Sequence, residues 1–353
     1  MYKWFKEMRK ESPVYYDGKT WNLFKYNDCK AVLNDHKRFS SNLTGYNEKV
    51  EKLRGGKVLF DIPTRYTMLT SDPPLHDELR GITSDIFTPS NISKYEKFIR
   101  DVTVNLLSEA DDEFDVIEKL AIPLPILVIS KILGIDVDVK KVKDWSDLVA
   151  LRLGKPNEIF SIGKKYLELI NFTKNEIKKS QNTTVEGLIQ KIANSNLSDI
   201  EKQGYLILLM IAGNETTTNL IGNAIEDLTL YNLWDYVKQN GALKVVEEAL
   251  RYSPPVMRTI RVTKEKVKIG DVIIDEGEYV RVWIASANRD EEVFTDPEKF
   301  IPDRSPNPHL SFGSGIHLCL GAPLARLEAR IALEEFAKRF KVRDIVYREK
   351  IDN

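Results

Sequence analysis

The sequence is poor in cysteine and histidine, with two cysteines and four histidines among 353 residues. Two cysteines, Cys29 and Cys319, are too few for a disulfide framework, which favours a reducing compartment. The formal net charge is -1, so no excess of basic residues points to nucleic acid. These shortages argue against a disulfide-stabilised secreted protein and against a nucleic-acid-binding protein.

Long hydrophobic runs are also missing. The longest run, Leu206 to Ala212, is far below the ~18 residues that a membrane-spanning helix needs. Residues 1–10 are charged throughout and contain no apolar core typical of a signal peptide. Because 42% of the residues are hydrophobic and 30% are charged, we expect a soluble globular protein in the cytoplasm, with no membrane contact.

The periodicity of apolar residues indicates the fold class. Residues 14–16, 21–24 and 280–284 have the pattern of short strands bounded by Gly and Asp turns. Most of the remaining chain has helical period, as at 102–107, 126–133 and 162–177, with a polar loop at 180–184. We find no internal repeat and no Gly/Ser linker. The sequence therefore predicts one mainly α domain over residues 1–353, with a small β portion.

The most informative segment is 312–321, which places Cys319 in a loop with Gly313, Gly315 and Gly321. Glycine allows backbone to approach a large flat group closely. The loop runs into a predicted helix with Pro323 near its start, and the helix dipole there favours a thiolate over a thiol. A thiolate in such a loop suits a haem iron as fifth ligand. The alternative is a buried structural cysteine in a turn.

A second unusual segment lies inside a long predicted helix from the capping box at Ser198 to about Leu230. Its middle, 212–219, has a glycine followed by three threonines, which are poor helix formers. A threonine hydroxyl can bond a backbone carbonyl and bend the helix. Glu215 beside Thr216 could hold water and relay protons, although a solvent-facing polar patch is the simpler alternative.

The spacing Phe-x-x-Gly-x-His-x-Cys-x-Gly resembles the haem-thiolate loop of the cytochrome P-450 monooxygenases, and residues 212–217 resemble their oxygen-activating helix. The chain is most similar to compact soluble members from thermoacidophilic archaea, and its Lys- and Glu-rich composition suits a thermophile. The resemblance implies the triangular prism fold of that family, with haem b between the long central helix and the cysteine loop. It also implies a C-terminal hairpin that the chain, ending at Asn353, does not include.

The resemblance assigns roles to particular residues. Cys319 becomes the axial ligand of the haem iron, and Glu215, Thr216 and Thr217 become the catalytic residues. The haem propionates are held by His76, Arg80, Thr259, Arg261 and His317. Glu248, Arg251 and Arg304 form a buried structural network. The implied substrate pocket contains Leu69, Leu151, Leu153, Leu208, Ala212, Thr217 and Val256, although such positions belong equally often to a core.

The implied reaction inserts one oxygen atom of O2 into a C–H bond of a small to medium apolar substrate. No flavin or pyridine-nucleotide fingerprint is visible, because 154–163 lacks the strand–glycine–helix context. Electrons are therefore expected from a separate ferredoxin-like protein. Two other functions stay open, namely a peroxide-driven haem peroxygenase and a non-enzymatic haem protein that senses or carries a gas. We expect a monomer.

The helix that follows Cys319 carries Arg326 and Arg330, with Lys338 and Arg339 further along. The first two are four residues apart and share one helix face, which predicts a docking surface for an acidic electron donor. The alternative is an ordinary solvated face whose basic residues pair with Glu328, Glu334 and Glu335.

Overall fold

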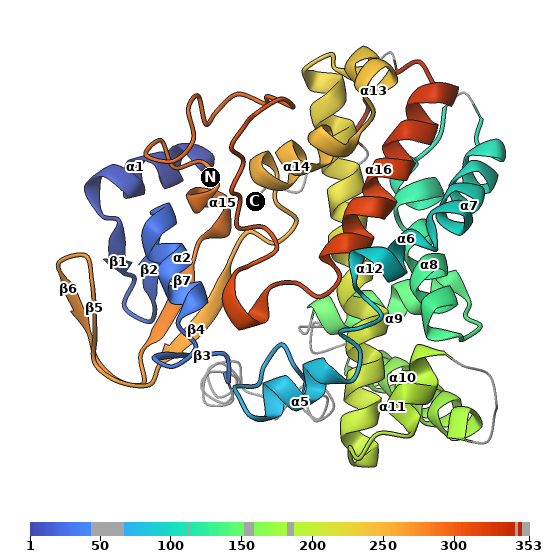
Figure 1. Cartoon of the computed structure of the whole chain (residues 1–353), viewed down its shortest axis with the longest axis horizontal. Helices are drawn as coiled ribbons and strands as arrows, with labels where there is room; N and C mark the ends of the chain where they lie inside the picture. Colours follow the sequence, from blue (N-terminus) through green and yellow to red (C-terminus); the bar gives the residue numbers. More distant parts are fainter. Residues whose placement is uncertain (44–66, 112, 152–158, 182–186, 343–344, 348–353) are drawn as a thin grey trace. The chain divides into compact units, whose positions relative to one another are not determined.

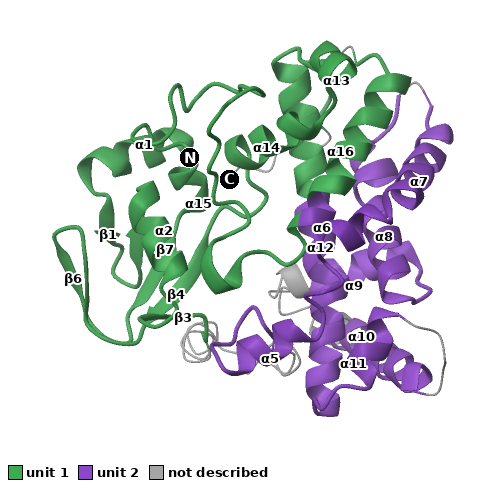
Figure 2. Ribbon diagram, in the orientation of Figure 1, with its two compact units in different colours: residues 1–43, 219–322, 326–353 green, residues 44–218, 323–325 purple. Residues whose placement is uncertain are grey.

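The computed structural model describes residues 1–43, 67–111, 113–151, 159–181, 187–342 and 345–347. Backbone contacts divide the chain into two compact units (Figure 2). Unit 1 comprises residues 1–43, 219–322 and 326–353, and unit 2 comprises residues 44–218 and 323–325. The single domain expected over 1–353 stays a prediction.

A five-stranded sheet forms the β portion of unit 1, with strand order β1-β2-β7-β4-β3 (Figure 1). Strands β2 and β7 pair in parallel, and the other neighbours are antiparallel. A separate hairpin joins β5 and β6. The strands are β1 (Val14–Tyr16), β2 (Trp21–Leu23), β3 (Phe39–Ser40), β4 (Thr259–Thr263), β5 (Val267–Ile269), β6 (Val272–Ile274) and β7 (Tyr279–Val282).

The helices of unit 1 cover this sheet and continue beyond it. They are α1 (Tyr2–Glu11), α2 (Tyr26–Asn34), α13 (Trp234–Asn240), α14 (Leu243–Tyr252), α15 (Ile284–Ala287), the short 3-10 helix η3 (Gly315–His317) and most of α16 (Ala322–Arg339). The core includes Leu33 of α2 with Val280 and Val282 of β7. Cys29 is fully buried in the same core, which identifies it as a packing residue.

Unit 2 is helical. It contains α5 (Leu75–Gly81), α6 (Pro89–Ser93), α7 (Glu96–Ser108), the π-helical turn η1 (Ile117–Ala121), α8 (Pro123–Leu133), α9 (Val139–Leu151), α10 (Ile159–Gln181) and α11 (Leu188–Ala193). Helix α8 is apolar on nearly all sides because it packs against α7, α9 and α11. The long helix α12 (Asp199–Leu230) belongs to unit 2 up to Thr218 and to unit 1 from Asn219.

Most elements agree with the sequence predictions. The strands at 14–16 and 21–23 and the helices around 102–107, 126–133 and 162–177 are present. Helix α12 begins with the predicted capping box, in which the Ser198 amide donates to Glu201 Oε2 at 2.8 Å. The predicted strand 280–284 is instead 279–282, because residue 284 already begins helix α15.

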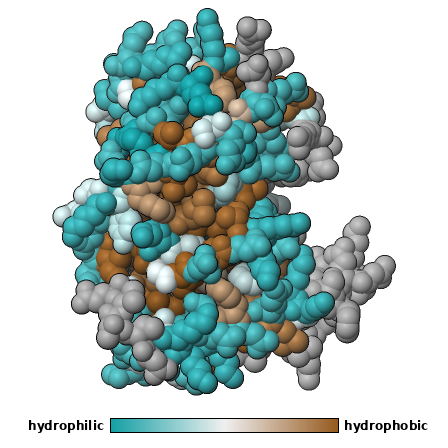
Figure 3. Space-filling view, turned by 90° about the vertical axis from the view of Figure 1, so that its right-hand side faces the viewer, coloured by the Kyte–Doolittle hydropathy of each residue, from teal (hydrophilic) through white to brown (hydrophobic). Residues whose placement is uncertain are grey.

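The surface is mostly polar in the view of Figure 3, where hydrophilic residues cover most of the visible face and hydrophobic residues gather across its middle. Among the residues that the structure describes, no helix combines the length and the hydrophobicity needed to cross a bilayer.

Candidate functional site

The loop around Cys319 has, at two positions, a left-handed backbone that favours glycine. Gly313 and Gly315 have φ values of +72° and +70°. A Cβ at Gly315 would also lie 2.8 Å from the Leu33 carbonyl oxygen. The Cys319 amide donates to the Phe312 carbonyl at 2.8 Å, and the Cys319 side chain is exposed. The loop therefore presents a thiol on a fixed backbone, unlike buried Cys29.

Arg261 and Thr259 lie on the same face of β4, as their alternation in the sequence predicts. The Arg261 side chain is buried, and its Nη1 donates to Thr259 Oγ1 at 3.2 Å and to the Ile260 carbonyl at 2.9 Å. Elsewhere in unit 1, His317 Nε2 lies 2.9 Å from Ser41 Oγ. Unit 1 thus has three side-chain groups that can donate a hydrogen bond to an anionic ligand, namely the Arg261 guanidinium, the Thr259 hydroxyl and the His317 imidazole.

His76 and Arg80 lie on helix α5 of unit 2, one turn apart as predicted. His76 is buried, and its Nδ1 lies 2.8 Å from Asp77 Oδ1. Helix α5 is tied to α12 by Tyr205, whose hydroxyl lies 2.9 Å from the Leu79 carbonyl oxygen and donates to it.

Sequence reasoning missed Tyr205, which reads as one more apolar position of a buried helix. Its hydroxyl also lies 2.6 Å from Thr83 Oγ1, so it links α12 to both the end of α5 and the segment that follows. Burial raises the pKa of Tyr205 to about 12, so the phenol stays neutral and keeps its proton for the Leu79 carbonyl.

Helix α12 stays helical through its middle, yet its exposure changes there. Ala212, Gly213 and Glu215 are exposed, whereas the preceding residues 209–211 are buried. Thr216 Oγ1 donates to the Ala212 carbonyl at 2.9 Å, the hydroxyl–carbonyl bond that the sequence suggested. A Cβ added at Gly213 would meet no atom within 4 Å. The result is an open strip of small and polar residues on a helix that is otherwise largely buried.

The predicted pocket residues differ in exposure. Leu69 and Val256 are exposed by 61% and 39%, Ala212 is exposed and Leu208 is half-buried, while Thr217 is buried. Leu153 and the side chain of Leu151 lie outside the described residues. Exposure of Leu69 and Val256 argues against a core role for these two, whereas burial of Thr217 suits packing.

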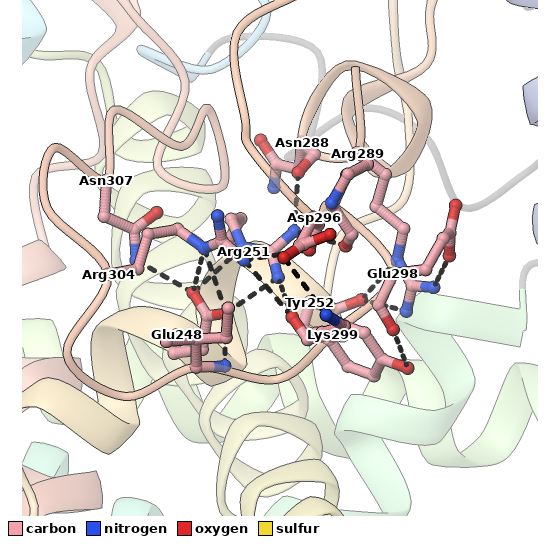
Figure 4. A network of polar contacts seen from close by, with 12 residues as sticks. Glu248, Arg251, Tyr252, Asn288, Arg289, Asp296, Glu298, Lys299, Arg304 and Asn307 are labelled. Atoms are coloured by element: carbon pink, nitrogen blue, oxygen red, sulfur yellow. Dashed lines mark hydrogen bonds and ion pairs between the residues drawn. The ribbon is translucent and has the colours of Figure 1, made fainter. Parts of the chain in front are cut away.

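Glu248, Arg251 and Arg304 lie together in unit 1, as Figure 4 shows. Arg251 binds Glu248 through two parallel bonds, Nε to Oε2 at 2.9 Å and Nη2 to Oε1 at 2.7 Å, and both side chains are fully buried. Arg304 Nε lies 3.1 Å from Glu248 Oε1. The Ile301 amide and Asn307 Nδ2 also donate to this carboxylate, at 2.8 and 3.2 Å. Removal of one partner would leave a buried charge uncompensated, which is costly.

Three basic residues of α16 have acidic partners. Arg326 Nε donates to Glu247 Oε1 at 2.6 Å, Arg330 Nη1 lies 3.4 Å from Glu334 Oε1, and Lys338 Nζ lies 2.7 Å from Glu335 Oε1. Arg330 and Lys338 thus pair within α16, whereas the partner of Arg326 lies on α14. These pairs favour the alternative of an ordinary helix face over a docking surface.

Two buried carboxyl groups were also missed. Burial raises the pKa of Asp227 to about 7, although Ser253 Oγ donates to it at 2.8 Å. Burial raises the pKa of Glu328 to about 8. Neither position carries a motif, so long-range packing decides their environment.

Comparison with known proteins gives the class of the chain. Residues 242–353 match the family model described as Cytochrome P450. All 353 residues align with "Cytochrome P450 119" of Sulfurisphaera tokodaii at 78% identity, covering 96% of that protein. "Cytochrome P450 119" of Sulfolobus acidocaldarius is 65% identical over 356 aligned residues, covering 100% of this chain and 95% of that protein. A crystal structure of a thermophilic cytochrome P450 from Sulfolobus tokodaii superimposes with a TM-score of 0.91 at 78% identity, covering 100% of this chain and 96% of that one.

Fold and relatives together define a haem-dependent monooxygenase. The chain belongs to the cytochrome P450 family and is a P450 enzyme with haem b as its cofactor. The predicted resemblance, the similarity to members from thermoacidophilic archaea and the mainly α fold with a small β portion are confirmed.

The described residues fit this cofactor. Haem needs a thiolate ligand, partners for two propionates and a surface against which a flat ring can lie. Unit 1 offers the exposed Cys319 thiol and the Arg261 guanidinium. Within unit 2, helix α12 separately has an open strip at Ala212 and Gly213, where the side chains are small.

Proposed function

We propose that this enzyme inserts one oxygen atom of O2 into a C–H bond of a small to medium apolar substrate, as a monomer in the cytoplasm. One observation carries the proposal: Cys319 is exposed in a loop whose backbone is fixed by two left-handed glycines and by the bond to Phe312. In a member of the cytochrome P450 family, a thiol held in this way suits the ligand that haem chemistry requires.

In this proposal the Cys319 thiolate would hold the haem iron, and five residues would hold the haem propionates, namely His76, Arg80, Thr259, Arg261 and His317. When bound, haem supplies the oxygen activation and the two-electron chemistry, with thiolate donation favouring O–O cleavage. Arg261 supports this role because its guanidinium is buried and already oriented by Thr259 and the Ile260 carbonyl. An oriented guanidinium loses less conformational entropy when it binds a carboxylate.

Glu215 and Thr216 are proposed to deliver protons. Thr216 Oγ1 donates its hydrogen bond to the Ala212 carbonyl, so the oxygen can still accept a hydrogen bond from water. The exposed Glu215 carboxyl can exchange protons with solvent, and water would connect the two groups because neighbouring helix residues point about 100° apart. Thr217 is buried on the same helix, and packing next to this pair is the role that its burial supports.

The apolar class of substrate rests on the side chains that the family places around its pocket. Leu69 and Val256 have exposed apolar side chains, and on α12 Leu208 is half-buried and Ala212 is exposed. Leu151 and Leu153 complete the proposed set. Burial of such surface against an apolar guest is favourable by about 25 cal/mol per Å2.

Electrons are proposed to come from a separate ferredoxin-like protein. The proposed docking face is the helix after Cys319 with Arg326, Arg330, Lys338 and Arg339, and an acidic donor would have to compete there with Glu247, Glu334 and Glu335, the carboxylate partners of Arg326, Arg330 and Lys338. Reduction by such a donor should slow as salt screens opposite charges. Stopped-flow reduction across a salt series measures this, and a flat rate profile would count against the docking face.

Cys319→Ala against Cys29→Ala tests the central proposal. The reduced carbon monoxide complex of the wild type and of Cys29→Ala should show the red-shifted band of a thiolate ligand, and Cys319→Ala should lose it. Substrate oxidation should require both O2 and an electron donor. Turnover that runs on peroxide alone would indicate a peroxygenase, and haem binding without turnover would indicate a sensor or carrier.

A further inference from the structure

A single carboxylate, that of Glu247 on α14, binds residues on both sides of the cysteine loop, His309 before it and Arg326 after it. Its Oε1 accepts Arg326 Nε at 2.6 Å, and its Oε2 accepts Arg326 Nη2 at 3.1 Å. Oε2 also lies 3.1 Å from His309 Nε2. His309 precedes Phe312 and Arg326 follows Cys319, so Glu247 closes the segment 309–326 into a ring of contacts that contains the thiol.

Arg326 continues this connection toward Cys319. Its guanidinium carbon lies 4.4 Å from the centre of the Phe312 ring, within the range of a cation–π contact. The carbonyl of Phe312 in turn accepts the Cys319 amide at 2.8 Å. A short path of contacts therefore runs from Glu247 through Arg326 and Phe312 to the backbone of Cys319.

The carboxyl group of Glu247 stays ionised. Burial acts to raise the pKa of its carboxyl, but hydrogen bonds from His309 and Arg326 outweigh burial and lower the pKa to about 2. The neighbouring Glu248 serves the separate buried network of Arg251 and Arg304. Two adjacent carboxylates on α14 thus hold two different segments of unit 1.

We propose that Glu247 is a positioning residue for Cys319, acting through Arg326 and Phe312 to fix the thiolate toward the haem iron. The inference rests on the proposed role of Cys319 as axial ligand. Residues that orient a metal ligand are worth about 10–100-fold in affinity or activity. Hydrogen bonding and solvent access around a ligand sulfur also tune the iron that it binds. Arg326 is then part of this support for the thiol, which removes it from the donor surface.

The test compares Glu247→Gln with Glu334→Gln, a matched loss of charge from an arginine pair on α16 that does not hold the loop. Glu247→Gln should release haem to an acceptor protein at least about tenfold faster than the wild type. A larger fraction of its reduced carbon monoxide complex should lack the red-shifted thiolate band. Glu334→Gln should match the wild type in both measurements. Equal spectra and haem-release rates in all three proteins would overturn the inference.

A double-mutant cycle tests the path. If Glu247 acts through Arg326, Glu247→Gln should add little in an Arg326→Gln background. Additive effects would overturn the path. If Glu247→Gln does not fold, Arg326→Lys replaces it, because lysine keeps the charge and loses the two-pronged contact; a wild-type spectrum and haem-release rate in Arg326→Lys would then reject the inference. A wild type without the thiolate band would instead refute the proposed function itself.

Discussion

The cysteine loop in unit 1 and the middle of α12 in unit 2 are held by different kinds of contact. Charged groups tie the loop: Glu247 binds residues on both sides of it, and Arg251 and Glu248 lie in the adjoining network. The middle of α12 has a neutral hydroxyl bond at Thr216 and an exposed carboxyl at Glu215.

Charge-assisted bonds are about twice as strong as neutral ones, so the two regions differ in how firmly they are fixed. A metal ligand must keep one geometry, whereas groups that move protons need access to water. We therefore expect the free energy of unfolding and the geometry of the cysteine ligand to depend on the cysteine loop and its network, and proton delivery to depend on the middle of α12.

Arg251→Met should have the largest effect. It leaves the fully buried Glu248 without its two-pronged partner, at a cost of about 3–5 kcal/mol in the free energy of unfolding. Chemical denaturation measures this cost. Lys244→Met, which breaks an exposed ion pair with Asp303, is the control and should change stability little. Equal losses in both variants would show that burial of the pair is unimportant.

Asp227 of unit 1 differs from the paired carboxylates around the cysteine loop, because burial raises its pKa to about 7 from 3.8. The folded state binds its proton more tightly than the unfolded state. The corresponding stability is therefore fully present below pH 3.8 and is lost as the pH rises through about 7. Asp227→Asn should remove this loss, so its melting temperature relative to wild type should increase across that range. Thermal unfolding in a pH series checks it, and a constant difference between the two proteins would contradict the assignment.

Thr216→Ala tests the proton delivery proposed for the middle of α12. The variant should fold and bind haem normally, but a smaller share of electrons should reach product, since general acid–base assistance contributes roughly 10²–10⁴-fold. Product formed per electron consumed is the measurement. Thr229→Ala is the matched control, because Thr229 makes the same bond, to the Ile225 carbonyl, in the same helix. If both variants lose coupling equally, the relay has no support.

Tyr205→Phe should have the smallest effect. It removes two neutral hydrogen bonds of α12, to the Leu79 carbonyl and with Thr83 Oγ1, each worth about 1 kcal/mol, and should speed haem release modestly by loosening α5. Tyr236→Phe, which loses an exposed hydroxyl bond to Asp303, serves as control. If Tyr205→Phe released haem as fast as Glu247→Gln, charged and neutral contacts would contribute equally to haem retention, which would contradict the comparison.

Local spacing explains which features the sequence could predict. The Ser198–Glu201 cap, the pair Glu248–Arg251 and the shared face of His76 and Arg80 each depend on residues three or four apart. Helical geometry alone brings such residues together, so no knowledge of the tertiary fold is needed.

Contacts between distant parts of the chain could not be predicted in this way. The place of Arg326 on the helix after Cys319 predicts a docking surface. Its partner Glu247 lies 79 residues earlier in the chain, so local spacing does not reveal the pair. Strand β4 begins at Thr259, and the Met257 carbonyl just before it accepts the amide of Ala285, a residue of α15. In both cases the residue contacts a helix of unit 1 that is distant in the sequence, and that contact determines its role.

The adjacent carboxylates of α14 also constrain how this protein can be recombined with its relatives. Successive residues of a helix point about 100° apart, so Glu247 and Glu248 cannot exchange partners without rotation of the whole helix. A crossover placed between α14 and α16 would join one parent's carboxylates to another parent's arginines. Chimeric enzymes should therefore inherit residues 247–326 as one block.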